Sequence, residues 1–193
     1  MMYNPGEKFQ YNNTGYVVLA MIIEKIVGMD FDKYLAKLIF EPCGMKSTAY
    51  HELDRLPANC ATAYIHDEER DEYFTNYYST NAKSDGAGGV YTTVDDIARF
   101  WKHFFAADIV SVQTVATMTS VQATEVDEDG DCTDYGFGFW LDEGVPFFQG
   151  MDPGISFMTR RQPCGTLTVL MSNFCDNVWR INNNIEDMLA DEA

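Results

Sequence analysis

The chain has 193 residues, of which 46% are apolar and 14% aromatic, and a formal net charge of −17. A chain of this length and composition can bury a core, which excludes an intrinsically disordered protein. The negative charge repels phosphates, so nucleic acids and acidic membrane surfaces are not expected as partners.

Neither cysteines nor histidines predict a metal site. The five cysteines lack a C-x-x-C spacing and the three histidines lack ligand-like spacing, so we expect no disulfide framework, no metal and no cofactor. The N-terminus has no signal-peptide pattern, and no stretch is apolar and long enough to span a bilayer. As it stands, the sequence predicts a cytoplasmic chain.

Two helices are expected near the N-terminus. Residues 14–28 predict a buried helix, with Asn13 or Thr14 as N-cap and Gly28 as the C-terminal stop. Asp30 is the expected cap of the second helix. Its apolar stripe is Phe31, Tyr34, Leu35, Leu38 and Ile39.

Residues 46–80 are polar and tyrosine-rich without a clear period, and predict a long, partly irregular excursion. Thr93 is then expected to cap a helix with a strong apolar face, and residues 110–121 predict a shorter helix. The apolar face of the first of these helices consists of Ile97, Phe100, Trp101 and Phe104.

The C-terminal part predicts a sheet followed by a helix. After an acidic loop at Glu125–Asp131, short apolar runs bounded by Gly, Pro, Asp and Asn predict an antiparallel meander. Residues 176–193 predict an amphipathic helix. Helices, then sheet, then helix make an α+β pattern in a single domain spanning residues 1–193. The expected apolar side of the last helix is Val178, Ile181, Ile185 and Leu189.

Several stretches together resemble the serine β-lactamase-like proteins, which include class C β-lactamases, penicillin-binding proteins and related esterases. They are "PGEKFQYNNTGYVVLAMIIEKIVG", "GAGGVYTTVDDIARF" and "YGFGFWLDEG…DPGISF", in this order. The resemblance implies acyl transfer by a serine nucleophile, with Ser-x-x-Lys, Tyr-x-Asn and Lys-Thr-Gly or His-x-Gly motifs around one cleft. The serine needs a neighbouring base, and the oxyanion needs preorganised N–H donors.

The triplet Tyr11-Asn12-Asn13 matches the Tyr-x-Asn motif. By resemblance, Tyr11 takes the acid/base position and Asn13 binds the substrate's amide or the motif lysine. From the triplet alone, the simpler interpretation is that Asn13 caps the helix while Tyr11 packs. The surrounding pattern favours the family's site.

The third motif is altered. Aligning Asp152-Pro153-Gly154 with the family's Pro-Gly places Phe148-Gln149-Gly150 at Lys-Thr-Gly, and only Gly150 matches. The resemblance then implies a substrate-binding edge at Gln149, Gly150 and Met151, with the backbone N–H of Met151 in the oxyanion hole. Phe148 cannot supply the motif's cation.

The first motif is missing, because no serine is followed by lysine at the third position. Thr80 and Lys83 have the spacing but lie after the tyrosine motif, in the wrong order. The sequence therefore resembles the C-terminal part of a longer, often exported protein. We expect no activity from this chain alone, and self-association or pairing with the missing N-terminal segment over exposed apolar surface.

Two functional hypotheses follow, and a third alternative is a purely structural α+β domain with a chance likeness to the family. In the first, the full-length form is a serine hydrolase acting on a β-lactam, a D-Ala peptide or a small ester. In the second, the protein is a non-catalytic binding or regulatory module that kept the cleft. The altered Phe148-Gln149-Gly150 favours the second hypothesis, and an upstream Ser-x-x-Lys would favour the first. The polar excursion at residues 51–84 is expected to border the cleft.

Overall fold

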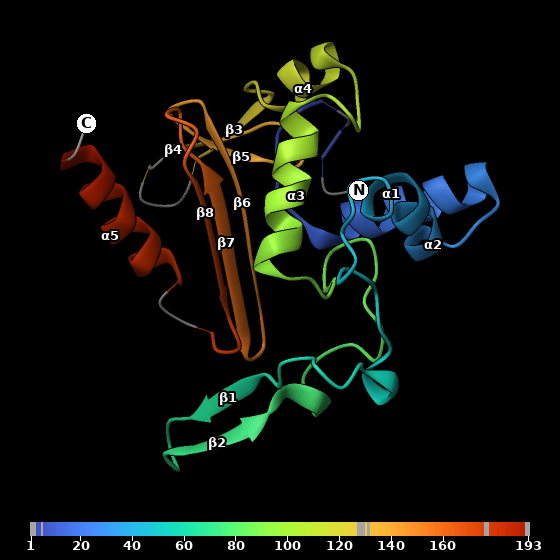
Figure 1. Ribbon diagram of the computed structural model, residues 1–193, viewed down its shortest axis with the longest axis vertical. Helices are drawn as coiled ribbons and strands as arrows, with labels where there is room; N and C mark the ends of the chain where they lie inside the picture. The colour runs from blue at the N-terminus through green and yellow to red at the C-terminus, as the bar shows by residue number, and fades with distance from the viewer. Residues whose placement is uncertain (1–2, 5, 127–129, 131, 176–177, 192–193) are drawn as a thin grey trace.

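The molecule is organised around a six-stranded antiparallel sheet in which each strand pairs with the next along the chain. Helix α3 packs on one face and helix α5 on the other, as Figure 1 shows. This confirms the predicted α+β class and the C-terminal meander.

The computed structural model describes residues 3–4, 6–126, 130, 132–175 and 178–191. The helices are α1 (Asn13–Val27), α2 (Phe31–Leu35), α3 (Val94–Phe105), α4 (Val112–Met118) and α5 (Val178–Asp191). The sheet strands are β3 (Ala123–Val126), β4 (Cys132–Tyr135), β5 (Trp140–Asp142), β6 (Val145–Asp152), β7 (Ile155–Arg161) and β8 (Leu167–Ser172).

The main core lies between α3 and the sheet. The hydroxyl of Thr93 accepts a hydrogen bond from the backbone N–H of Asp96 at 3.3 Å, which confirms the predicted cap of α3. The predicted apolar face then points at the strands, with Ile97, Trp101 and Phe104 almost fully buried. Burial of such large side chains stabilises the folded state by about 1.5–3 kcal/mol each.

Helix α5 covers the opposite face, although its inner side differs from the predicted one. Val178 is buried, but Ile181 is 43% exposed and Asn182 is completely buried. The side chain of Asn182 accepts a hydrogen bond from the hydroxyl of Thr168 at 3.1 Å and donates one to Glu186. A buried amide is tolerated here because its hydrogen-bonding groups have partners.

The start of α1 corrects the predicted cap. The N-cap is Asn12, whose Oδ1 accepts a hydrogen bond from the backbone N–H of Gly15 at 2.7 Å, and not Asn13 or Thr14. At the other end Gly28 has a φ of 67°, in the left-handed region, and its N–H donates to the carbonyl of Glu24. That end of the helix is as predicted.

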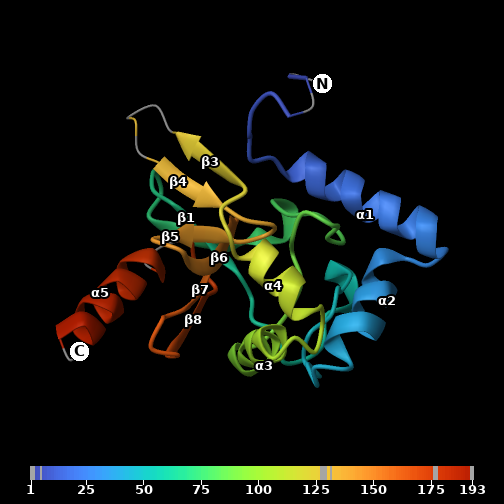
Figure 2. The same cartoon turned by 90° about the horizontal axis from the view of Figure 1, so that it is seen from above.

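The prediction of a buried α1 is wrong, because only Ala20 is buried. On that side the loop at Gly86 lies so close that an added Cβ would come within 2.5 Å of the Cβ of Ala20. The opposite side carries the "α1 stripe", defined as Val18, Ile22 and Ile26, which are 47–77% exposed. Figure 2 shows α1 and α2 beyond α3, away from the sheet. Within the described residues, no helix combines the length and apolarity that crossing a membrane requires.

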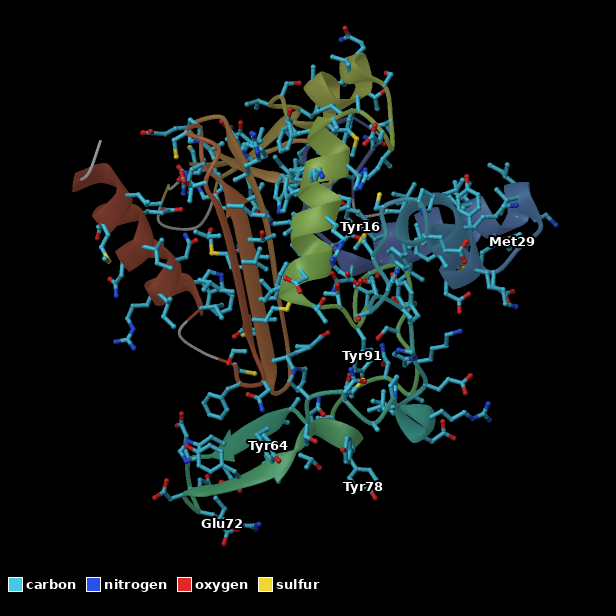
Figure 3. All side chains as sticks on the ribbon, in the orientation of Figure 1. Tyr16, Met29, Tyr64, Glu72, Tyr78 and Tyr91 are labelled. Atoms are coloured by element: carbon cyan, nitrogen blue, oxygen red, sulfur yellow. The ribbon has the colours of Figure 1, made fainter. Side chains whose placement is uncertain are left out.

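The excursion at residues 46–80 is more ordered than predicted, because it contains an antiparallel hairpin of β1 (Tyr64–Asp67) and β2 (Glu72–Thr75). Residues with high β-propensity flank a polar turn in which Asp71 has a φ of 52°. The backbone N–H of Tyr64 donates to the carbonyl of Asn173, which ties the hairpin to the end of β8. Figure 3 shows Tyr64, Glu72 and Tyr78 at this extremity of the molecule.

Two smaller predictions also need correction. Asp30 precedes α2 but makes no side-chain capping bond, because its carboxylate binds Lys33 instead. Of the predicted acidic loop Glu125–Asp131, Glu125 and Val126 belong to β3, while residues 127–129 and 131 lie outside the described part. Helix α2 continues directly into a π-helical turn at Ala36–Phe40.

A substitution at Thr159 tests the connection between α3 and the sheet. Thr159 is fully buried, and its hydroxyl accepts from the indole N–H of Trp101 at 2.9 Å and donates to the carbonyl of Thr168 at 2.8 Å. Thr159→Val keeps the shape but leaves the indole N–H without a partner, which should lower the free energy of unfolding by about 1–3 kcal/mol. Urea denaturation measures this. Thr133→Val, at an exposed position of β4, is the control, and equal effects of the two would contradict the prediction.

Candidate active site

Tyr11 lies in the loop just before α1 and packs against two aromatic side chains of the sheet. Its ring centroid is 5.4 Å from that of Trp140 and 6.3 Å from that of Tyr135, which it meets edge-on. The Tyr11 side chain is 44% exposed, so it is held by these rings and remains reachable from solvent. The loop thus brings the predicted acid/base residue to the start of β5.

Trp140 is also where the pairing of β5 with β6 ends. It pairs with Phe147, and among the described residues no strand pairs with β6 beyond that point on this side. A two-residue turn joins β6 to each neighbouring strand, and these turns fix which residues of β6 hydrogen-bond to which neighbour. The backbone N–H and C=O of residue 147 face β5, whereas those of residues 148, 150 and 152 face β7. By the same alternation, the backbone of Gln149 and Met151 faces an open edge that begins beside Tyr11.

The side chains along this edge point in different directions. Phe148 belongs to the core under α3, with its ring centroid 5.2 Å from that of Trp101. Gln149 points to the other face, where its Oε1 accepts a hydrogen bond from the indole N–H of Trp179 at 2.6 Å. Gly150 has open space where a Cβ would be, and the side chain of Met151 is 63% exposed. The edge therefore offers backbone groups without a bulky side chain over them.

Asn13 is the first residue of α1 and is exposed. In the described part of the chain, no hydrogen bond is made by its side chain, since Asn12 serves as the cap. Tyr11 and Asn13 thus lie together at the helix start. No hydrogen bond between described residues joins either of them to Gln149, Gly150 or Met151, so the roles of all five residues remain predictions.

An aromatic cluster around Tyr11 escaped the sequence analysis. The hydroxyls of Tyr16, on α1, and Tyr135, at the end of β4, form a hydrogen bond with each other. The ring centroid of Phe9 lies 5.1 Å from that of Tyr135, and that of Trp140 lies 4.7 Å from it. These residues are far apart in the sequence, and only the tyrosine-rich motif before α1 hinted that aromatic side chains gather here.

The environment of the cluster disfavours phenolate. Partial burial raises the pKa of Tyr11, and the neighbouring Tyr16 adds to the shift. Burial and the hydrogen bond to Tyr16 raise the pKa of Tyr135 still more strongly. Desolvation always favours the neutral form of an acid. Tyr11 is therefore a protonated phenol at neutral pH.

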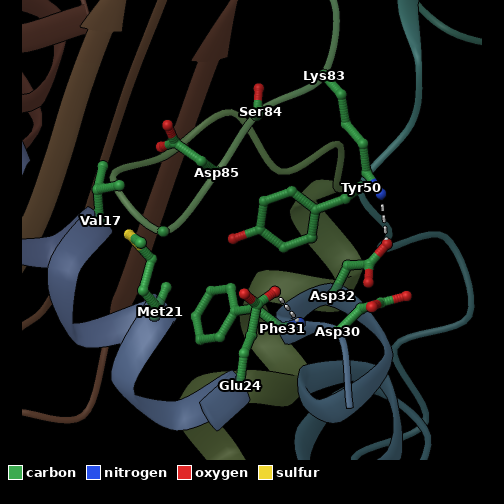
Figure 4. Close-up of a pocket in the computed structure, with 12 residues that line it drawn as sticks. Val17, Met21, Glu24, Asp30, Phe31, Asp32, Tyr50, Lys83, Ser84 and Asp85 are labelled. Atoms are coloured by element: carbon green, nitrogen blue, oxygen red, sulfur yellow. Dashed lines mark hydrogen bonds and ion pairs between the residues drawn. The ribbon is translucent and has the colours of Figure 1, made fainter. Parts of the chain in front are cut away.

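A cavity of about 250 Å³ lies beside α1, between Met21, Tyr50 and the loop at residues 83–86 (Figure 4). Lys83 lines it, but its Nζ is 2.7 Å from the carboxylate of Asp32. The lysine of the out-of-order Thr80-x-x-Lys83 sequence is thus engaged in an ion pair. Across the described residues, no group of three or more His, Cys, Asp or Glu side chains could hold a metal ion.

The raised tyrosine pKa values make stability depend on alkaline pH. In the folded state Tyr11 and Tyr135 keep their protons to a higher pH than in the unfolded chain, where the tyrosine pKa is about 10. The stabilisation is complete below that pH and is lost as pH rises toward the folded-state pKa values. Urea denaturation across alkaline pH should show a falling free energy of unfolding. The fall should be shallower in Tyr135→Phe and the same as in the wild type in Tyr78→Phe, the control at a fully exposed position. Parallel curves for the wild type and both variants would show that Tyr135 does not cause the pH dependence.

The comparisons with known proteins agree with this geometry. A family model described as Beta-lactamase matches residues 1–173. Penicillin-binding protein 4* of Bacillus subtilis (strain 168) is 31% identical over 154 residues, which cover 75% of this chain and 33% of that protein. A Salmonella agona (strain SL483) protein named for D-alanyl-D-alanine carboxypeptidase activity is 30% identical over 115 residues, or 50% of this chain and 26% of that protein.

A solved structure gives the same result for the fold. The penicillin-binding protein from Bacillus halodurans superposes with a TM-score of 0.88 at 26% identity, covering 97% of this chain and 59% of that one. The chain spans about a third or less of the two curated relatives. Because the family model matches most of its residues and the fold agrees along almost its whole length, the chain belongs to the serine β-lactamase and penicillin-binding protein family.

Proposed function

We propose that this chain supplies the acid/base group and the backbone donors of an acyl-transfer site that acts on a small amide or ester. The observation that carries the proposal is that Tyr11 packs on Trp140, where the open edge of β6 begins. The family membership and the carboxypeptidase name of one relative support a D-alanyl peptide, a β-lactam or a small ester as the substrate class.

Each proposed role follows from an atom at this site. The phenol of Tyr11 passes a proton between the nucleophile and the leaving group, and the amide of Asn13 holds the substrate. The N–H of Met151 lies on the open edge, where it can donate to a developing oxyanion. Gly150 lets the substrate backbone approach the strand closely. Gln149 contributes through its backbone, since its side-chain oxygen is bonded to Trp179.

We further propose that the chain has no acyl-transfer activity by itself. None of its serines has lysine three residues later, so a nucleophile has to come from polypeptide outside this sequence. The pKa of Tyr11 is raised, whereas a base working at neutral pH needs it lowered by nearby positive charge. Phe148 stands where the family has a cation, and Lys83 is held by Asp32.

Turnover of nitrocefin and of p-nitrophenyl acetate tests this proposal. The purified chain should show no burst and no turnover of either compound. In a fusion that carries the Ser-x-x-Lys segment of a relative in front of this chain, Tyr11→Phe should lower kcat by about 100-fold or more. Tyr78→Phe, at a fully exposed position, should leave kcat unchanged. A serine-dependent burst from the chain alone, or full activity of Tyr11→Phe, would overturn the proposal.

The second candidate function is a binding module without catalysis. It is favoured by Phe148, which replaces the motif's cation and is held in the core next to Trp101. Under this hypothesis the open edge of β6 still binds a peptide or a β-lactam ring. Binding without turnover, in a protein that includes a Ser-x-x-Lys segment, would select this function over the first.

We also propose that the α1 stripe is an association surface. In the chain alone a second copy covers Val18, Ile22 and Ile26, and in a longer protein the segment with the nucleophile covers them. The middle of α1, from Val17 to Ile23, is a continuous apolar run, and exposed apolar patches of this kind drive association.

Sedimentation velocity of the purified chain tests the association surface. The wild-type chain should self-associate. Ile22→Lys should weaken the association about tenfold or more, since burial of one isoleucine contributes about 1.5–3 kcal/mol. Val112→Lys, a matched exposed apolar position on α4, should have no such effect. A wild-type chain that sediments as a monomer at all concentrations would rule the surface out.

A further inference from the structure

A cavity of about 350 Å³ opens beside Tyr11, between the loop before α1 and the end of β4. Its apolar walls come from three separate segments of the chain. Phe9 and Tyr11 belong to the loop, Tyr16 and Leu19 to the first turns of α1, and Tyr135 to β4. This size and an aromatic lining with few polar groups are typical of small-molecule sites.

Among the described residues, those that line this cavity carry no charged side chain. Burial raises the pKa of Tyr11 and Tyr135, so both remain neutral phenols. A charged group placed here would lose hydration without gaining an ion pair, which is unfavourable. An anionic group would also be repelled by a protein with a net charge of −17. The cavity is therefore suited to an uncharged group.

The walls are held in place by contacts among themselves. Tyr135 is fixed by its hydroxyl bond to Tyr16 and by the edge-on contact of its ring with Trp140. Phe9 packs on the same ring at a centroid distance of 5.1 Å. Aromatic walls fixed in this way favour a flat partner, which can stack on them or meet them edge-on.

Two of the residues that line the cavity, Gln10 and Asn12, carry a side-chain amide, and that of Asn12 is already engaged. Asn12 accepts from the backbone N–H of Gly15 through Oδ1 and donates to the carbonyl of Gln10 through Nδ2. Recognition at this cavity therefore rests mainly on shape and aromatic contact, with Gln10 left to hydrogen-bond a polar atom of the occupant. Its opening beside Tyr11 puts it next to the proposed reacting group.

We propose that this cavity is a specificity subsite that takes an uncharged aromatic group of the substrate. The inference rests on the proposed function, since it treats the occupant as part of the molecule that reacts beside Tyr11. The subsite deepens that function by selecting, among small amides and esters, those that carry an aryl group.

Ligand-observed saturation-transfer NMR on the purified chain tests the subsite, with phenylacetamide as the probe and acetamide as the probe without the ring. Phenylacetamide should bind and acetamide should not. Leu19→Trp should fill the cavity and weaken phenylacetamide binding by about tenfold or more, which corresponds to about 1.4 kcal/mol. Val112→Trp is the control, because Val112 is an exposed apolar residue on α4 that neither lines the cavity nor belongs to the α1 stripe.

Phe9→Ala provides a second test by removing a wall instead of adding bulk. It should also weaken the binding of phenylacetamide, so the subsite remains testable if Leu19→Trp does not fold. Equal binding of the two amides, unchanged binding in Leu19→Trp or Phe9→Ala, or equal loss in Val112→Trp would overturn the subsite. Binding needs no nucleophile, so these outcomes are independent of acyl transfer. If a protein that contains both this chain and a Ser-x-x-Lys segment turned over no ester or amide, the proposed function would be wrong, but the subsite would still stand.

Discussion

The contact between Trp101 and the middle of β6 and β7 determines where the site can be. The indole N–H is bonded to Thr159, and the indole ring packs on Phe148, the cross-strand partner of Thr159. With Phe148 fixed inward, strand alternation puts Gln149 and Met151 on the other face and their backbone groups on the open edge. A core contact thus sets the orientation of a strand whose backbone, not its side chains, is proposed to act.

This contact also gives a reason why the proposed third motif can carry Phe148 in place of a cation without disrupting the strand. A lysine or histidine at residue 148 would place a polar group against Trp101 and Phe157, where burial without a partner is costly. Phenylalanine instead adds apolar area to the core. Phenylalanine at residue 148 therefore stabilises the core but supplies no positive charge. The backbone geometry along the open edge of β6 does not depend on which of these residues occupies position 148.

Much of the fold could be read from the sequence, where local pattern and burial agreed. The apolar face of α3, its Thr93 cap and the meander followed from spacing and turn residues, and the structure confirms them. The hairpin at Tyr64–Thr75 was missed because each strand has only four residues in a polar, tyrosine-rich region, and a tertiary contact to Asn173 stabilises it. The prediction that α1 is buried failed for a physical reason as well. An apolar sequence indicates that a helix tends to be buried, but it does not show that the same chain provides the residues that bury it.

The candidate site divides in the same way. Tyr11, Asn13 and the strand at Gln149–Met151 came from motif resemblance, and the structure adds that Tyr11 and the open edge both meet at Trp140. The tyrosine partners of Tyr11 could not be predicted, because 119 residues separate Tyr16 from Tyr135 and no local pattern reports such a contact.

The shortness of β5 has one more consequence. Because β5 pairs with only the first three residues of β6, a short row of main-chain donors and acceptors is available to an extended peptide, which could add to the sheet as a partial strand. A long exposed edge of this kind would also invite pairing with other sheets and fibre growth. Here the row is only a few residues long and contains Gly150, so it is a weak template for such pairing. The unpaired edge is therefore too short to make the sheet a site of aggregation.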